Sequence, residues 1–311
     1  MTISLTANLT ASIPPGQPLV SVIVPCYNSE PTIQACLAAL LQQETTFAYE
    51  VVVVDSSLDR TAEIVTSEFP AVKLVRLARR TYAGAARNAG VRATTAPLCL
   101  MIDSDCLAAP DLVERVVRRH QEAEYAAVGG SLGNGTPGSL SGTIAYLIEF
   151  KEFMPTTPMR LARSIPTANI AYRREALERC NYFDEDMWLA EDILLNWKIT
   201  SAGGRILYDP EIKVTHLNRT GWRRVLSYQV SLGRLSAKAR KRGGLPGTQL
   251  IDHPALILLM PLARTARAAK WFASCDLKIF FLFLLLWPIY LLAASFWSYG
   301  FFRGATTSSE R

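Results

Sequence analysis

The chain has 311 residues, of which half are apolar and 19% are charged, and its net charge is +6. This composition excludes a disordered chain, which would be poor in apolar residues and rich in charge. The 18 glycines and 17 prolines also exclude the collagen-like and low-complexity classes. The basic residues gather toward the C-terminus instead of covering the whole chain, so no nucleic-acid partner is expected.

Four short apolar runs recur through the first third of the chain, at residues 20–24, 50–54, 72–76 and 98–102. Continuous β-branched runs of this kind are typical of strands buried on both faces, as in a parallel sheet. Apolar residues at helical spacing lie between and after them, at residues 33–41, 64–69, 84–93 and 110–117. The alternation predicts a doubly wound α/β fold with a mostly parallel sheet.

Three polar segments follow these strands directly: Pro25-Cys-Tyr-Asn28, Asp55-Ser-Ser-Leu-Asp59 and Asp103-Ser-Asp105. Ligands of such sheets bind at the carboxyl ends of the strands, so these segments are expected to meet. Two carboxylates spaced as in Asp103-Ser-Asp105 can share a hard divalent cation, Mn²⁺ or Mg²⁺. A polar turn is the alternative for this short motif taken alone.

The pattern is weaker after residue 125. Residues 128–142 contain six glycines and are predicted to be a loop, and they lack the GK[ST] of a Walker phosphate loop. Helices are expected at 143–154 and 191–202, and a strand at 169–173. His216 follows the next alternating stretch, and a lone histidine is more often a packed or surface residue than a ligand.

The C-terminal segment 279–302 contains 24 residues without a formal charge. A helix of that length spans about 36 Å, enough to cross a bilayer, although a buried core helix is the alternative. The apolar run 255–263 is too short to span, and residues 264–272 have the pattern of an interfacial helix. The basic run 238–242 fits either a solvated helix face or contact with anionic lipid.

Basic residues cluster before this segment, so the positive-inside rule predicts a single-pass protein of the cytoplasmic membrane. Residues 1 to about 275 would face the cytoplasm. Residues 1–18 have no basic residue and no apolar core run, so they are expected to be a flexible tail and not a signal peptide.

Taken in order, five segments resemble the motifs of family 2 glycosyltransferases. They are residues 20–28 (VSVIVPCYN), 50–61 (EVVVVDSSLDRT), 86–90 (ARNAG), 103–105 (DSD) and 190–192 (AED). The resemblance covers roughly residues 19–235 and implies a GT-A-like fold. It also fits the tail, since many bacterial members carry C-terminal membrane segments.

The resemblance implies a role for each matching residue. Contacts to the nucleotide-sugar are expected from Pro25, Tyr27, Asn28, Asp55, Arg87, Asn88 and Asp103. Asp105 is the expected direct metal ligand, with Asp103 beside it and His216 as a further candidate. Asp192 is the expected general base, with Glu191 as the second choice, although acids here could also serve only to stabilise a helix N-terminus.

The resemblance further implies an inverting, metal-dependent transfer from a nucleotide-diphosphate sugar to an acceptor hydroxyl, for which a lipid-linked acceptor is one candidate. The Q-x-x-R-W motif of processive synthases is absent, which favours a non-processive enzyme. A non-catalytic membrane scaffold and a nucleotidyltransferase are the alternatives. The expected organisation is a tail (1–18), a nucleotide-sugar-binding half (19–125), an acceptor-binding half (126–245), an interfacial segment (246–278), a transmembrane helix (279–302) and a second tail (303–311).

Overall fold

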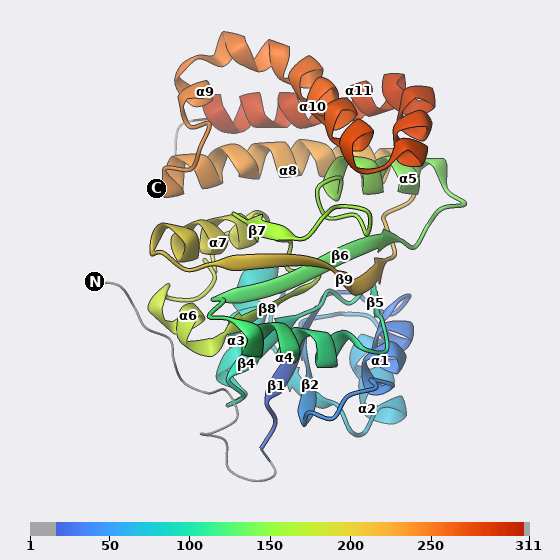
Figure 1. Cartoon of the computed structure of the whole chain (residues 1–311), viewed down its shortest axis with the longest axis vertical. Coiled ribbons are helices and arrows are strands. Elements are labelled where there is room, and N and C mark those ends of the chain that lie inside the picture. Colours follow the sequence, from blue (N-terminus) through green and yellow to red (C-terminus); the bar gives the residue numbers. More distant parts are fainter. Residues whose placement is uncertain (1–16, 308–311) are drawn as a thin grey trace. The chain divides into compact units, whose positions relative to one another are not determined.

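The computed structural model describes residues 17–307, which form two compact units (Figure 1). The first unit comprises the chain up to Gly133 together with Met159–His216, and the second comprises Asn134–Pro158 and the chain from Leu217 onward. Most of the predicted N-terminal tail, and residues 308–311, lie outside the described residues. The two functional halves expected within 19–245 stay a prediction.

The first unit is built on one sheet, which has nine strands within the described residues, in the order β3-β2-β1-β4-β8-β6-β9-β5, with β7 paired to β9. The strands are β1 (Val20–Cys26), β2 (Tyr49–Asp55), β3 (Lys73–Arg76), β4 (Leu98–Met101), β5 (Cys106–Ala108), β6 (Ala127–Asn134), β7 (Arg160–Ala162), β8 (Ile170–Arg173) and β9 (Ile206–His216). The helices of this unit are α1 (Ile33–Leu41), α2 (Thr61–Glu68), α3 (Ala83–Arg92), α4 (Leu112–Glu122), α6 (Arg174–Arg179) and α7 (Glu191–Ser201).

Strands β1 to β4 pair in parallel, which confirms the expectation for this part of the sheet. β1 lies between β2 and β4, so the strand order reverses beside it. Ligands of open α/β sheets bind at such a switch point, outside the carboxyl ends of the strands. The continuous apolar runs of β1, β2 and β4 are buried because helices cover both faces.

The later strands pair antiparallel, and three of them, β5, β6 and β7, were not indicated by the sequence. Part of the glycine-rich stretch 128–142, expected to be a loop, forms strand β6, so that expectation was wrong for residues 128–134. Gly130 explains why: a Cβ there would lie 1.9 Å from the carbonyl oxygen of Ile212 on β9. Glycine is required by this close approach of two backbones, and it removes the side-chain pattern that marks a strand.

Helix α3 packs closely on β1 and β2 through Gly90. A Cβ at this position would lie 2.5 Å from Ile23 Cγ2 and 3.1 Å from Val54 Cγ2. The absence of a side chain lets the helix lie against the sheet, which brings Arg87 and Asn88 of the same helix to the carboxyl ends of the strands. Gly90→Ala would therefore require a shift of the whole helix.

The buried His120 of α4 predicts a pH-dependent stability. Burial, together with Arg173, lowers the pKa of His120 from 6.5 to about 3, so the folded ring is neutral. Between pH 3 and pH 6.5 the unfolded chain therefore binds a proton at His120 that the folded protein does not. The stabilising contribution of the neutral ring is present above pH 6.5 and decreases as the pH is lowered. We expect the contribution of His120 to stability to fall by about 2 kcal/mol between pH 6.5 and pH 5.

Urea unfolding at several pH values measures this dependence. His120→Gln keeps an amide donor for the carbonyl of Ala171, 3.3 Å from His120 Nε2, and should remove the part of the pH dependence that is due to His120. His253→Gln, which changes an exposed histidine, should leave it in place. Equal slopes in the two variants would contradict the assignment.

The second unit is helical in its described part. It contains α5 (Leu140–Glu149), α8 (Trp222–Gly243), α9 (Gln249–Asp252), the 3-10 helix η1 (Pro254–Leu259), α10 (Met260–Cys275) and α11 (Leu277–Thr306). α11 is the one described helix that is long and apolar enough to cross a membrane. Its first turn is capped by the side chain of Asp276, which accepts hydrogen bonds from the backbone N–H groups of Lys278 and Ile279.

Candidate active site

The end of β1 forms a short loop that is tied to the end of β2. Asn28 has a left-handed backbone (φ 53°), which asparagine tolerates better than most residues. Its backbone N–H donates to Ser57 Oγ at 2.7 Å, and its side-chain Oδ1 accepts from the N–H of Leu58 at 3.0 Å. Asn28 therefore fixes the shape of both loops. Pro25 lies inside β1, while Tyr27 is exposed and stacks with Arg80, whose guanidinium lies 4.5 Å from the ring centroid.

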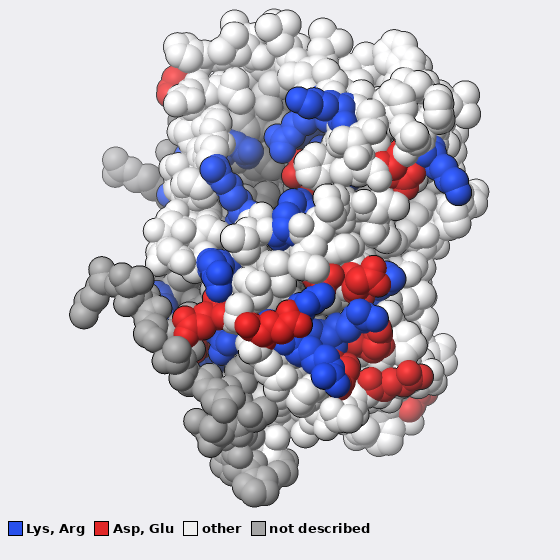
Figure 2. All heavy atoms as spheres, in the orientation of Figure 1, with Lys and Arg blue, Asp and Glu red and all other residues white. Residues whose placement is uncertain are grey.

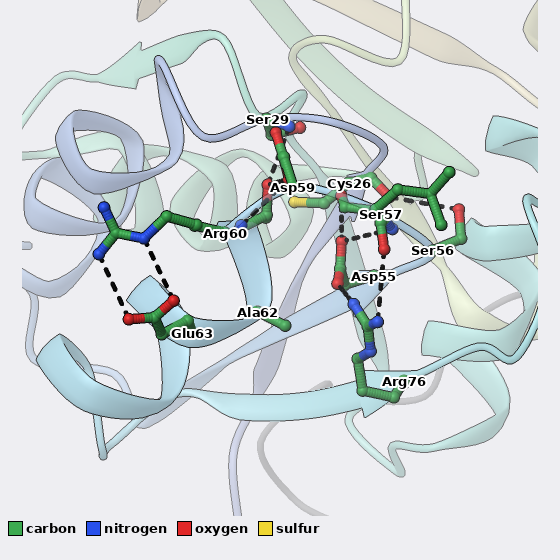
Figure 3. A network of polar contacts seen from close by, with 12 residues as sticks. Cys26, Ser29, Asp55, Ser56, Ser57, Asp59, Arg60, Ala62, Glu63 and Arg76 are labelled. Carbon is green, nitrogen blue, oxygen red and sulfur yellow. Dashed lines mark hydrogen bonds and ion pairs between the residues drawn. The ribbon is translucent and has the colours of Figure 1, made fainter.

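Asp55 ends β2 and has no exposed surface. The strand register pairs it with Cys26 on one side and Arg76 on the other, and its carboxylate binds the Arg76 guanidinium and the Ser57 hydroxyl (Figure 3). Arg76 also donates to the backbone carbonyl of Ser57 at 3.3 Å. The sequence alone did not point to Arg76, because only the parallel register places it beside Asp55.

The same loop continues into α2 through Asp59. Its carboxylate accepts from the Thr61 hydroxyl at 2.6 Å and from the backbone N–H of Glu30 at 3.1 Å. Thr61 Oγ1 in turn accepts from the N–H of Ser29 at 2.9 Å. The loops after β1 and β2 are thus joined by a continuous hydrogen-bond network, which fixes the shape of the surface at the carboxyl ends of these two strands.

Arg87 joins two of the predicted motifs. Its side chain is 3% exposed, and it donates to Asp103 Oδ1 at 2.7 Å and to Glu191 Oε1 at 2.6 Å. Burial alone would lower the pKa of Arg87, but the two carboxylates outweigh it and raise the value. Residues far apart in the chain, from α3, the end of β4 and the start of α7, therefore meet at one guanidinium.

Asn88 faces the loop that precedes α7. Its Nδ2 donates to the carbonyl of Phe183 and to Glu185 Oε1, both at 2.9 Å, and its Oδ1 accepts from the N–H of Phe183 at 3.0 Å. Arg92 binds the same Glu185 oxygen at 3.1 Å. These three hydrogen bonds of the Asn88 amide all hold the 183–185 loop, so Asn88 acts as a positioning residue.

Glu191 and Asp192 begin α7 after Ala190, which has a left-handed backbone (φ 67°). Burial raises the pKa of Glu191 to about 7, against the opposing effect of Arg87. Burial also raises the pKa of Asp192, and Asp103 adds to the rise. Glu191 is buried in its ion pair, whereas Asp192 is only partly buried. A raised pKa brings a carboxylate closer to the range of an effective general base.

Asp105 and His216 meet beside Asp103. Strand β5 pairs with β9 so that Cys106 lies opposite His216, and Asp105 Oδ1 is then 3.5 Å from His216 Nε2. One ligand atom from each of Asp105, Cys106 and His216 lies within 4.8 Å of the others. Carboxylate and imidazole suit Mn²⁺, whereas the fully buried thiol of Cys106 is a poor ligand for a hard ion.

An open pocket of about 640 Å³ lies between the start of α3 and the loop before α7. The sequence did not indicate it, because its lining comes from two segments a hundred residues apart. Tyr82 and Trp188 are exposed aromatic residues on its wall, and Glu185 and Asp186 add carboxylates. Its volume is in the range of small-molecule sites. The lining residues are Arg80, Thr81, Tyr82, Ala85, Glu185, Asp186 and Trp188.

Comparison with known proteins identifies the family. Residues 21–180 match the model of glycosyl transferase family 2, and the chain belongs to that family. It is 29% identical over 218 residues to the succinoglycan biosynthesis protein ExoO of Rhizobium meliloti (strain 1021), covering 66% of this chain and 62% of that protein. It is 30% identical over 221 residues to an N-acetylglucosaminyltransferase of Mesorhizobium japonicum, covering 64% of this chain and 51% of that protein. The chain thus spans between about half and two thirds of the length of these relatives.

Solved structures confirm the GT-A-like fold. The mannosyltransferase PcManGT from Pyrobaculum calidifontis, in complex with GDP-Man and Mn²⁺, superposes with a TM-score of 0.62 at 22% identity, covering 93% of this chain and 86% of that one. S. aureus TarS in complex with UDP-GlcNAc superposes with a TM-score of 0.54 at 20% identity, covering 92% and 90%. At these identities the likeness establishes the fold.

Proposed function

We propose that the protein transfers a sugar from a nucleotide-diphosphate donor to an acceptor hydroxyl, in a single displacement that inverts the anomeric centre. The observation that carries the proposal is the Arg87 bridge, which joins Asp103 of the D-x-D motif to Glu191 beside Asp192. One arginine thus contacts a carboxylate proposed to lie at the diphosphate and a carboxylate next to the proposed base. The nucleotide-sugars bound by PcManGT and TarS support a donor of this class.

Each part of the site has a proposed role in the reaction. The loops of Asn28 and Asp55 bind the nucleotide, because their hydrogen-bond network preforms that surface. Asp192 takes the proton of the acceptor hydroxyl as that oxygen bonds to the anomeric carbon and the bond to the diphosphate breaks. Glu191 holds Arg87 in place. It is the second choice for the general base, because its carboxylate is already paired with Arg87.

Asp105 and His216, with Asp103 beside them, would hold the Mn²⁺ or Mg²⁺ ion. When bound, the cation offsets the negative charge that develops on the leaving diphosphate.

The pocket beside Tyr82 and Trp188 has the aromatic surface that a sugar or other acceptor group packs against. The apolar α11 supports a place at the cytoplasmic face of the membrane and a lipid-linked acceptor for cell-envelope synthesis.

A donor panel tests the proposal. Detergent-solubilised protein is incubated with UDP-, GDP-, dTDP- and CDP-sugars, with Mn²⁺, Mg²⁺ or EDTA, and nucleotide release and sugar transfer are measured. Turnover of one donor class only with metal is expected. Binding of a donor without transfer or hydrolysis would instead favour a scaffold, and release of pyrophosphate would favour a nucleotidyltransferase.

His216→Ala should weaken the metal site without removing the donor site. Even losing a hydrogen-bond partner of a metal ligand costs about 10–100-fold in metal affinity, so losing a direct ligand should cost at least as much. The Mn²⁺ concentration for half-maximal activity is expected to rise by about tenfold or more, and titration calorimetry of Mn²⁺ should show the same shift. His253→Ala, at an exposed histidine, is the control. An unchanged Mn²⁺ affinity in His216→Ala would exclude His216 as a ligand.

A further inference from the structure

Helix α11 has two different faces along its whole length. Ten residues at helical spacing are buried: Phe283, Leu286, Tyr290, Ala293, Ala294, Trp297, Ser298, Gly300, Phe301 and Ala305. The opposite face exposes large apolar residues: Leu277, Phe281, Leu282, Leu284, Leu285, Trp287, Leu292, Phe296, Tyr299 and Phe302. Of its most apolar 18-residue window, 28% is buried inside the protein. The helix is therefore neither a core helix nor free on all sides.

The buried face packs against α8 at backbone distance. A Cβ on Gly300 would lie 2.0 Å from the carbonyl oxygen of Val230, and a Cβ on Gly233 would lie 1.9 Å from that of Trp297. A Cβ on Gly304 would lie 2.3 Å from the carbonyl oxygen of Arg234. Contacts this close exist only because both helices carry glycine where they cross. α8 and α11 thus form one packed pair, and α11 cannot change its surroundings without α8.

α8 is not a helix that hydrocarbon can surround. It exposes Arg234, Lys238, Lys241 and Arg242 over the same stretch that contacts α11. Lys241 Nζ donates to the carbonyl oxygen of Ala305 at 2.7 Å, which ties its charge to the last turns of α11. If α11 crossed a bilayer with this partner attached, several cations would enter with it, at a cost that membrane helices rarely bear.

α10 brings another cation against the middle of α11. The Arg264 guanidinium lies 3.9 Å from the centroid of the Trp297 ring, and its Nε is buried without a hydrogen-bond partner among the described residues. In a spanning arrangement of residues 279–302, Trp297 would lie about 10 Å from the bilayer midplane, inside a hydrocarbon core of half-thickness about 15 Å. Arg264 would then carry its charge into the hydrocarbon core.

We infer that α11 does not span the membrane but lies in the plane of its surface, with its exposed apolar face in the acyl boundary of an anionic lipid bilayer. The exposed cations of α8 and α10 then reach lipid phosphates at the level of the headgroups, where each favours binding. Leu258, Leu259 and Leu262 of η1 and α10 add exposed apolar surface. Figure 2 shows large uncharged areas over the part of the molecule that contains α10 and α11, with a group of lysine and arginine side chains among them. This inference replaces the single crossing that the sequence predicts.

The position of the C-terminus tests the inference, because an in-plane helix leaves both of its ends on the cytoplasmic side. Thr307→Cys, at an exposed site, is expressed in the full chain in bacterial cells and treated with a membrane-impermeant maleimide. We expect labelling only after the cells are opened, with the protein recovered in the membrane fraction. Glu178→Cys, at an exposed position of the first unit, is the matched cytoplasmic control.

Labelling of Thr307→Cys in intact cells would overturn the inference and establish a crossing. Recovery of the protein as a soluble dimer would also overturn it, because the apolar face would then be covered by a second copy. Flotation with vesicles of phosphatidylglycerol and phosphatidylcholine gives a second readout, in which binding should increase with the anionic lipid fraction and weaken with salt. None of these measurements depends on turnover, so their failure and that of the donor panel are distinguishable.

Discussion

Asp192→Asn is expected to lower the rate constant of sugar transfer by about 10²- to 10⁴-fold, the range contributed by a positioned general base. The amide keeps the shape of the carboxylate but cannot take the proton of the acceptor hydroxyl. The donor should still bind, because the loops of Asn28 and Asp55 are untouched. Steady-state kinetics with the donor found in the panel would show the loss in kcat with little change in the KM for the donor.

The pH profile gives a second signature of Asp192. A base must be ionised to act, so the wild-type rate should fall as the pH is lowered through its raised pKa. Asp192→Asn should lose this acidic limb along with the rate. Asp111→Asn, at a partly exposed carboxylate that precedes α4 and pairs with Arg115, is the control and should behave as wild type. Full transfer by Asp192→Asn would assign the base to another residue.

Arg87→Met is expected to destabilise the first unit by about 3–5 kcal/mol, the usual cost of removing one partner from a buried ion pair. Methionine fills much of the same space but leaves two carboxylates without their cation. Glu191 is 6% exposed and Asp103 is 32% exposed, so water compensates the second far better than the first. The free energy of unfolding, measured with urea on the solubilised protein, gives the size of the loss.

Arg92→Met is the matched control for Arg87→Met, because it removes an arginine from the same helix. Its partner is Glu185, and both side chains are about half exposed, so the expected change is within about 1 kcal/mol. A second variant, Arg87→Met with Glu191→Gln, should recover part of the loss by removing the buried charge. Equal free energies of unfolding for Arg87→Met and Arg92→Met would show that the ion pairs of Arg87 do not stabilise the first unit.

The sequence by itself determined the parallel half of the fold and the chemistry of the candidate site. The runs of β1, β2 and β4 are short and continuously apolar, which is typical of strands buried on both faces. The polar residues that follow them, from Asn28 to Asp105, must lie together because parallel strands end at one edge of the sheet. These inferences depend only on local pattern and on the chirality and connection rules of α/β folds.

Only the tertiary structure decided the partners of those residues. Arg76 reaches Asp55, and His216 reaches Asp105, through strand register, which no local pattern encodes. β6 and the α8–α11 pair depend on glycines, whose missing side chains allow two backbones to meet but leave no apolar periodicity to read. For α11 the consequence is largest. Length and hydropathy describe one helix in isolation, whereas the cations of α8 and α10 that pack on it decide which solvent it can enter.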